Sequence, residues 1–295
     1  MLARLLQRFL LALALAGAGL AVLWHGATGD VMLGALLMPW LAVVLATSYS
    51  MLKSRAHDAP AAQFYRAWWG ETVATFRAFV LRQPWAEAPP AVLPATGGTP
   101  QVPVLLVHGY VCNHRLWDDL TPRLREAGHD VLAINLEPLF VSIDHYAAHI
   151  ETSVQQLLQH SGQTRVALVG HSMGGLAIRA WMRQHGSDRV ARILTLGTPH
   201  AGTKAAKKNA TPNGRQMLWD SAWLQGLAES ESPERRALLR IALTPQDNIV
   251  FPQRAQTLPG ITPTLFEGLG HVQMCSAPEV IDWVSRELQH LNAPT

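Results

Sequence analysis

Two long apolar stretches set the first part of the chain apart from the rest. No residue is charged from Leu10 to Trp24 or from Val31 to Tyr49, and a short polar turn separates the two stretches. The second stretch approaches the ~20 residues that a helix needs to cross a bilayer. The first is shorter, and it gains length if the Arg8 side chain extends to the interface. We therefore predict two transmembrane helices that form a hairpin over residues 1–55.

The positive charges around the hairpin predict its orientation. Arg4 and Arg8 precede the first stretch, and Lys53 and Arg55 follow the second. The turn between the stretches contains Asp30 but no Lys or Arg. By the positive-inside rule, both ends of the hairpin lie in the cytoplasm, at a bacterial-type inner membrane.

Two other interpretations of this region stay open. Residues 1–27 have the charged start and the apolar run of a cleaved signal peptide, and cleavage would place the protein in the periplasm or outside the cell. The apolar run is long for a signal peptide, however, and no clear small-x-small cleavage site ends it. The two stretches could also form a buried hairpin in a soluble core.

Residues 56–101 predict an amphipathic helix followed by a linker. Aromatic and apolar residues of the segment 61–82 share one helical face: Tyr65, Trp68, Trp69, Thr72, Phe76, Phe79 and Val80. The charged residues Arg66, Glu71, Arg77 and Arg82 fall off that face. Such a helix lies at a membrane surface or packs on the next domain. Residues 84–101 are rich in Pro, Ala, Thr and Gly, which is typical of a linker.

Short apolar runs alternate with helical patterns from residue 102 onward. The runs are VPVLLVHG, DVLAINL, RVALVGHS, RILTLGTP, LLRIALTP and PTLFEGLG. They are nearly continuous in Val, Leu and Ile, as strands buried on both faces are. Helices are expected between them, for example over 142–160, 174–186 and 277–291. This rhythm predicts an α/β fold with a mostly parallel, doubly wound sheet over residues 102–295.

One of these runs ends in a motif that is typical of a catalytic serine. Gly170, Ser172 and Gly174 have the Gly-x-Ser-x-Gly spacing, and they lie where a predicted strand meets a predicted helix. In that context the motif predicts a nucleophile elbow. The glycines allow the sharp turn, and the free N–H groups of the helix N-terminus point toward the group that Ser172 would attack.

A serine hydroxyl needs a base to remove its proton, and the base needs a carboxylate to orient it. His271 follows the last predicted strand and is the candidate base, while Asp247 follows the preceding strand and is the candidate acid. Glu267 is a substitute acid. The order Ser172, Asp247, His271 is the order of α/β-hydrolases, and each residue follows a strand at the edge where open α/β sheets hold their sites.

The reaction would also need donors for the oxyanion. The first strand of the domain ends at His108, Gly109 and Tyr110. We expect the backbone N–H groups of Tyr110 and Met173 to form the oxyanion hole, with Gly109 supporting the first of them.

These motifs, with LGTPHAGT and GLGH, resemble the bacterial triacylglycerol lipase and esterase branch of the α/β-hydrolase superfamily. The resemblance covers about residues 102–290 and leaves out the hairpin. It implies the α/β-hydrolase fold and hydrolysis of carboxylic esters, with acyl chains in an apolar cleft. Many such lipases hold calcium through an Asp two residues after the catalytic His. Gln273 occupies that position here, so no cofactor is expected.

Residues 201–235 fall between strands, where a lid would be inserted. Trp219, Trp223, Leu224 and Leu227 make an apolar face at helical spacing. That face is typical of a lid over an acyl pocket and equally of a helix packed on the sheet.

Charge and composition exclude some other kinds of protein. A net charge of +3 does not favour a nucleic-acid partner. His145 and His149 are spaced like a metal pair beside Asp144, but no third ligand stands out, so no metal is predicted. Cys112 and Cys275 follow two strands that lead to the site, and free thiols are favoured over a disulfide on the reducing side of a membrane.

The predicted function is therefore a membrane-anchored serine ester hydrolase whose partners are an ester or lipid substrate and the bilayer. An acyltransferase or a thioesterase would use the same elbow, because the fold does not determine the reaction. A membrane scaffold without activity is a third hypothesis. The sequence leaves the oligomeric state open.

Overall fold

The computed structural model describes residues 1–295 except 26–27, 56–59, 87–89, 208–210, 290 and 292–295. Its centre is a six-stranded sheet in the order β2-β1-β3-β4-β5-β6, and every neighbouring pair is parallel. The strands are β1 (Val104–Val107), β2 (Val131–Ile134), β3 (Val166–His171), β4 (Val190–Leu196), β5 (Leu239–Leu243) and β6 (Thr264–Leu265). The predicted parallel, doubly wound sheet is confirmed.

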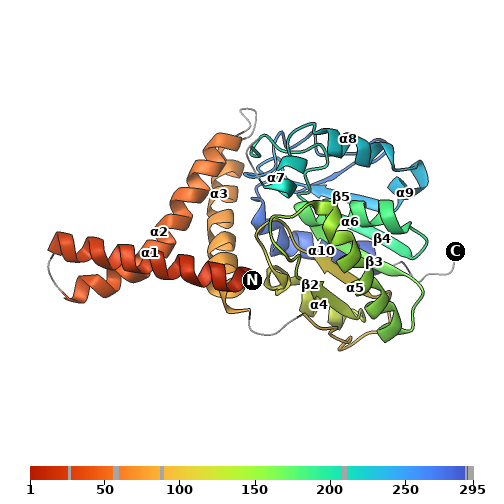
Figure 1. Ribbon diagram of the computed structural model, residues 1–295, viewed down its shortest axis with the longest axis horizontal. Helices are drawn as coiled ribbons and strands as arrows, with labels where there is room; N and C mark the ends of the chain where they lie inside the picture. The colour runs from red at the N-terminus through yellow and green to blue at the C-terminus, as the bar shows by residue number, and fades with distance from the viewer. Residues whose placement is uncertain (26–27, 56–59, 87–89, 208–210, 290, 292–295) are drawn as a thin grey trace.

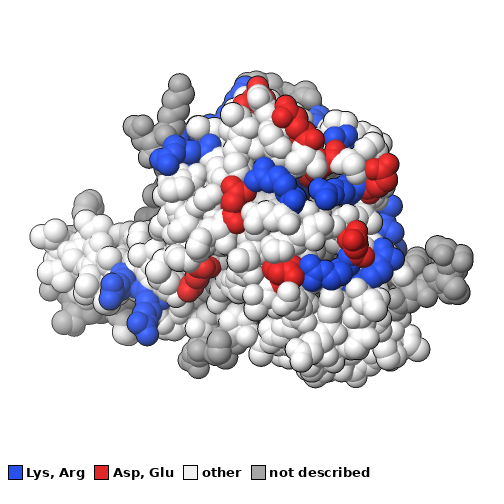
Figure 2. All heavy atoms as spheres, turned by 45° about the vertical axis from the view of Figure 1, so that its right-hand side comes forward, with Lys and Arg blue, Asp and Glu red and all other residues white. Residues whose placement is uncertain are grey.

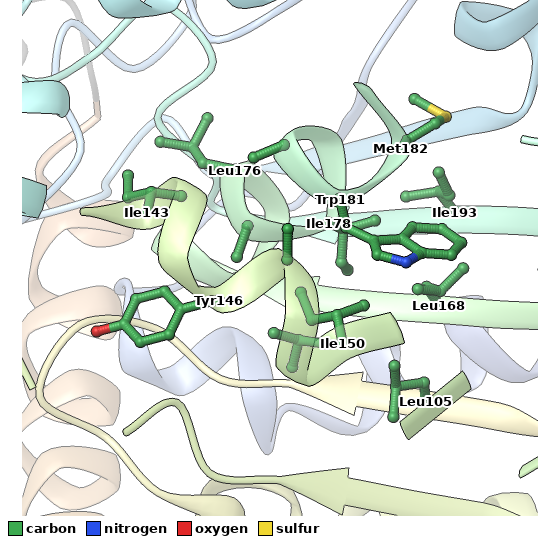
Figure 3. Close-up of a cluster of buried hydrophobic side chains, with 14 of the residues drawn as sticks. Leu105, Ile143, Tyr146, Ile150, Leu168, Leu176, Ile178, Trp181, Met182 and Ile193 are labelled. Carbon is green, nitrogen blue, oxygen red and sulfur yellow. The ribbon is translucent and has the colours of Figure 1, made fainter. Parts of the chain in front are cut away.

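Helices cover both faces of the sheet (Figure 1). On one face lie α5 (Tyr146–Ser161) and α6 (Met173–His185), and on the other lie α4 (Leu120–Glu126) and α10 (Pro278–Gln289). Alternate residues of β1 serve the two cores: Leu105 packs with α5 and α6, while Leu106 packs with α4 and α10. Figure 3 shows the first core around Tyr146 and Trp181. Strands buried on both faces explain the nearly continuous apolar runs in the sequence.

Two helices, α1 (Leu2–His25) and α2 (Thr28–Ser54), form the N-terminal hairpin and project away from the sheet domain (Figure 1). Their segments Leu2–Leu23 and Val31–Ser54 are long and apolar enough to cross a membrane. On the face shown in Figure 2, the side chains near the outer end of the hairpin that are not drawn in grey are uncharged, whereas charges of both signs lie on the domain. The two helices cross closely at Gly17 and Gly34. A Cβ atom on Gly17 would lie 2.2 Å from the Gly34 carbonyl oxygen, so a side chain would not fit between the helices.

Helix α3 (Ala61–Phe76) stands between the hairpin and the domain, and a π-helical turn (Arg77–Arg82) and a 3-10 turn (Gln83–Trp85) continue it. Its buried side differs from the expected apolar face: Glu71 is buried, whereas Tyr65 and Trp69 are exposed. The physical reason is that the Glu71 carboxylate finds backbone N–H donors on the domain. Within the expected linker, Leu93 pairs with Val131 in an antiparallel bridge.

The segment between β4 and β5 contains three short helices, α7 (Pro212–Gln216), α8 (Ala222–Glu229) and α9 (Pro233–Ala237). Polar contacts attach this segment to the sheet domain. Asp144 accepts hydrogen bonds from Trp223 Nε1 at 2.8 Å and from Gln216 Nε2 at 3.1 Å. Glu231 forms a buried ion pair with Arg179 of α6 at 2.6 Å. Leu224 and Leu227 of α8 join the core beside α6.

Candidate active site

Ser172 occupies a strained turn between β3 and α6. Its φ and ψ are 54° and −127°, a conformation that residues with a side chain rarely adopt. The turn is also crowded: a Cβ atom on Gly174 would lie 2.2 Å from the Val107 carbonyl oxygen, and one on Gly170 would lie 2.6 Å from Gly175 N. The glycines of the motif are therefore required by close backbone contacts. The turn holds Ser172 at the carboxyl end of β3.

His271 and Asp247 form a buried hydrogen-bonded pair. The Nδ1–H group of His271 donates to Asp247 Oδ2 at 2.7 Å. The other carboxylate oxygen, Oδ1, accepts the backbone N–H groups of Ile249 at 2.9 Å and Val250 at 2.7 Å. These contacts hold the carboxylate in one orientation. They leave the His271 Nε2 atom as the nitrogen available to accept a proton.

Several groups act on the protonation of His271. Burial by itself lowers the pKa of His271, but the carboxylates of Asp247 and then Glu71 raise it, and the net pKa lies above the ordinary value. The neighbouring His171 donates from Nε2 to the His271 carbonyl oxygen at 3.0 Å. Burial lowers the pKa of His171 well below its ordinary value, so this ring stays neutral.

Two cavities meet at Ser172. The first has a volume of about 300 Å³ and is lined by both Ser172 and His271, together with Gly109 and Tyr110. The second has a volume of about 360 Å³, and its lining is largely apolar: Tyr110, Pro199, Ala205, Ala206, Met217, Ile249 and Val250. Part of that lining comes from residues 201–235. Both cavities have mainly apolar walls, so an ester with apolar parts could place its carbonyl group at the Ser172 hydroxyl, where the two cavities meet.

The segment after β1 approaches Ser172 closely. A Cβ atom on Gly109 would lie 2.8 Å from the Ser172 Cβ atom, so only glycine fits there. Tyr110 lines both cavities, and Met173 begins α6 directly after Ser172. The expected oxyanion donors therefore belong to segments that lie next to Ser172.

The N-terminal helices contribute to the site, which the sequence did not predict. Ala46, Thr47 and Ser50 of α2 and Glu71 and Thr75 of α3 line the first cavity. Two hydrogen bonds link α2 to the segment that follows Asp247. Asn248 donates to Ser50 Oγ, and Gln253 donates to the Ser54 carbonyl oxygen, each at 2.9 Å. Asn248 in turn accepts the His271 backbone N–H at 3.1 Å. An isolated Glu among aromatic residues was the one signal in the sequence that could have pointed to α3.

The position of Gln273 does not fit a calcium ion. Its Oε1 atom accepts the Gly270 N–H group at 3.1 Å, and the nearby Glu71 carboxylate accepts backbone N–H groups. Among the residues that the structure describes, no cluster of three or more His, Cys, Asp or Glu side chains is arranged to hold a metal. Cys112 and Cys275 are both buried free thiols, and burial raises the pKa of Cys112 to about 12.

Comparisons with known proteins agree with this architecture. Residues 102–242 match the family described as alpha/beta hydrolase fold. A triacylglycerol lipase of Burkholderia plantarii is 34% identical over 130 residues, which cover 41% of this chain and 36% of that protein. A triacylglycerol lipase of Pseudarthrobacter phenanthrenivorans is 34% identical over 113 residues, which cover 35% of each chain. The chain thus spans about a third of the length of these curated relatives.

The fold is also similar to that of solved structures. The mature form of a Bacillus licheniformis lipase superposes with a TM-score of 0.59 at 17% identity, covering 68% of this chain and 99% of that one. The chain therefore has the α/β-hydrolase fold, and it resembles the triacylglycerol lipase and esterase branch of that superfamily.

Proposed function

We propose that the protein is a serine hydrolase that cleaves carboxylic esters. The observation that carries this proposal is the arrangement of Ser172 on a strained elbow beside the cavity that also contains His271, whose ring is hydrogen-bonded to Asp247. The similarity to triacylglycerol lipases supports ester hydrolysis as the reaction.

In the proposed mechanism, Ser172 Oγ attacks the carbonyl carbon of the ester while His271 Nε2 accepts its proton. Asp247 keeps the other proton of the ring on Nδ1 and stabilises the imidazolium that forms. The backbone N–H groups of Tyr110 and Met173 stabilise the oxyanion. His271 then gives its proton to the leaving alcohol, and a water molecule activated by the same ring releases the acid from Ser172.

The substrate we propose is an ester or lipid with an apolar acyl part. The largely apolar cavity of about 360 Å³ beside Ser172 supports this choice, because it offers an acyl chain a site away from water. Part of that cavity's wall comes from described residues of the segment 201–235, among them Ala205, Ala206 and Met217. We propose that they act as its cover, within a catalytic domain of residues 102–295.

An active-site probe tests the proposed nucleophile. A fluorophosphonate is expected to label the wild-type protein and not Ser172→Ala, because it reacts with an activated serine hydroxyl. Ser153→Ala is the matched control: its serine lies in α5, donates to the His149 carbonyl oxygen at 2.8 Å, and should be labelled like the wild type. Equal labelling of Ser172→Ala would contradict the assignment.

We further propose that residues 1–55 anchor the protein in a bacterial-type inner membrane, with the catalytic domain in the cytoplasm. Large apolar side chains on the hairpin are exposed: Leu15, Leu23, Met32 and Leu36 are each more than half accessible. An apolar surface of this kind needs a cover, which a bilayer provides. Leu6 near the start of α1 and Met51 near the end of α2 are buried, so both ends of the hairpin lie at the domain.

Reporter fusions test the orientation. A reporter fused after Thr295 is expected to give a cytoplasmic signal, because Lys and Arg residues lie at the start of the first helix and at the end of the second. A fusion after His25, at the end of the first helix, should give the opposite signal. A periplasmic signal from the full-length fusion would overturn the proposed orientation.

A further inference from the structure

Glu71 is a buried carboxylate that comes from outside the segment matched by the hydrolase family. It lies on α3 with 1% of its surface accessible, and no described Lys or Arg side chain forms an ion pair with it. A buried carboxylate without such a partner is costly unless other groups compensate its charge. The groups that compensate the charge of Glu71 therefore indicate the role of this residue.

Two backbone N–H groups directly after His271 provide that compensation. Val272 N donates to Glu71 Oε1 at 3.1 Å, and Gln273 N donates to Oε2 at 2.9 Å. These residues begin the 3-10 turn Val272–Cys275, whose N-terminal flanking residue is His271. Because both oxygens act as acceptors, the carboxylate holds the start of the turn at two points.

Two glycines lie at the contact between α3 and this turn. A Cβ atom on Gly270 would lie 2.4 Å from the Glu71 Cβ atom. On the other side, a Cβ atom on Gly70 would lie 2.3 Å from the Gln273 side chain. At Gly270 a side chain would push against the Cβ atom next to the backbone of α3, so the helix and the turn could not lie this close, whereas the end of the Gln273 side chain can turn away from residue 70. The pair therefore forms a tightly fitted contact between α3 and the turn.

Glu71 also lies within electrostatic range of His271. Both residues line the first cavity. Burial is the largest influence on the pKa of Glu71 and keeps it above the ordinary value, with a smaller contribution from Asp247. The N–H groups of Gln273 and Val272 and the charge of His271 act in the opposite direction. The other titratable groups that act on this pair are Asp247, the neutral His171 and the Cys275 thiol, whose pKa burial raises well above its ordinary value.

We propose that Glu71 is a positioning residue for His271: it holds the turn that carries the ring, and its charge stabilises the imidazolium that forms when Ser172 gives up its proton. The inference rests on the proposed hydrolase function. It assigns α3 a part in the reaction in addition to its place beside the hairpin. Asp247 and Glu71 then supply negative charge to His271 from the loop after β5 and from α3.

The test is the pH dependence of kcat/KM for a water-soluble p-nitrophenyl ester, measured on the full chain in detergent. In Glu71→Gln, kcat is expected to fall about 10- to 100-fold while KM changes little, because the turn is misplaced. His271 must be neutral to accept a proton, so activity falls as the pH drops through its pKa. Loss of the Glu71 charge lowers that pKa, and the acid limb should therefore move to lower pH.

Two variants separate this role from a purely structural one. Glu71→Asp keeps the charge on a shorter side chain, so kcat should fall while the acid limb stays close to that of the wild type. Thr72→Val is the matched control, because the hydroxyl group of this buried neighbour donates within α3, to the Trp68 carbonyl oxygen at 2.7 Å. Its profile should match the wild type.

Rates are normalised to active sites titrated with a fluorophosphonate, so partial unfolding does not alter the shape of the profile. An unmoved acid limb in Glu71→Gln would overturn the proposal. If Glu71→Gln yields no active sites, the test rests on the kcat of Glu71→Asp. A kcat of Glu71→Asp equal to that of the wild type would then contradict the proposal. Failure of the underlying function is distinguishable, because the wild type itself would show no hydrolysis that depends on Ser172.

Discussion

Replacing His271 by alanine is expected to lower kcat for ester hydrolysis by a factor of about 10⁶. The ring faces the same cavity as Ser172, and its Nδ1 atom is bound to Asp247, so Nε2 is the atom that would accept the serine proton. Without it, the Ser172 hydroxyl stays protonated and is a weak nucleophile. The neighbouring His171 is a poor substitute, because its Nε2 atom donates to the His271 carbonyl oxygen.

The measurement is kcat for a soluble ester, with far-ultraviolet circular dichroism to verify the fold. His149→Ala is the control, because His149 lies on the exposed surface of α5 and should keep wild-type activity. A His271→Ala variant that retains more than about one hundredth of the wild-type rate would show that another group serves as the base.

Replacing Asp247 by asparagine is expected to lower kcat by a factor of about 10⁴. Asp247 Oδ1 accepts two backbone N–H groups, so the Asn oxygen should take that position and its NH₂ group should face His271 Nδ1. An NH₂ group donates a hydrogen bond, which favours the tautomer with the proton on Nε2. In that tautomer, Nε2 cannot accept the proton of Ser172.

Glu267→Gln is the matched control for this prediction. Glu267 is the alternative acid in the sequence, and its carboxylate accepts from Gln63 Nε2 at 2.6 Å in an exposed contact. This variant should hydrolyse esters at close to the wild-type rate. A large loss of kcat in Glu267→Gln together with a small loss in Asp247→Asn would show that Glu267, and not Asp247, is the acid.

The sequence alone was sufficient for features that depend on local pattern. Strands buried on both faces must be apolar throughout, so the runs that contain β1 to β5 were recognisable without a structure. The Gly170-x-Ser172-x-Gly174 turn was recognisable for a related reason, since its strained backbone and close contacts leave few residues that fit. The order of Ser172, Asp247 and His271 along a parallel sheet predicted that they would lie at one edge.

The tertiary structure alone decided which parts of the N-terminal region meet the site. A carboxylate on an amphipathic helix is usually exposed to solvent, so Glu71 was expected to lie off the packed face. In the folded protein it is buried, because it accepts backbone N–H groups from residues about 200 positions later in the chain. The same holds for Ser50 and Asn248, whose contact joins α2 to the chain beside Asp247. Such contacts depend on how α2 and α3 dock against the sheet domain, and the sequence pattern within a segment does not predict that docking.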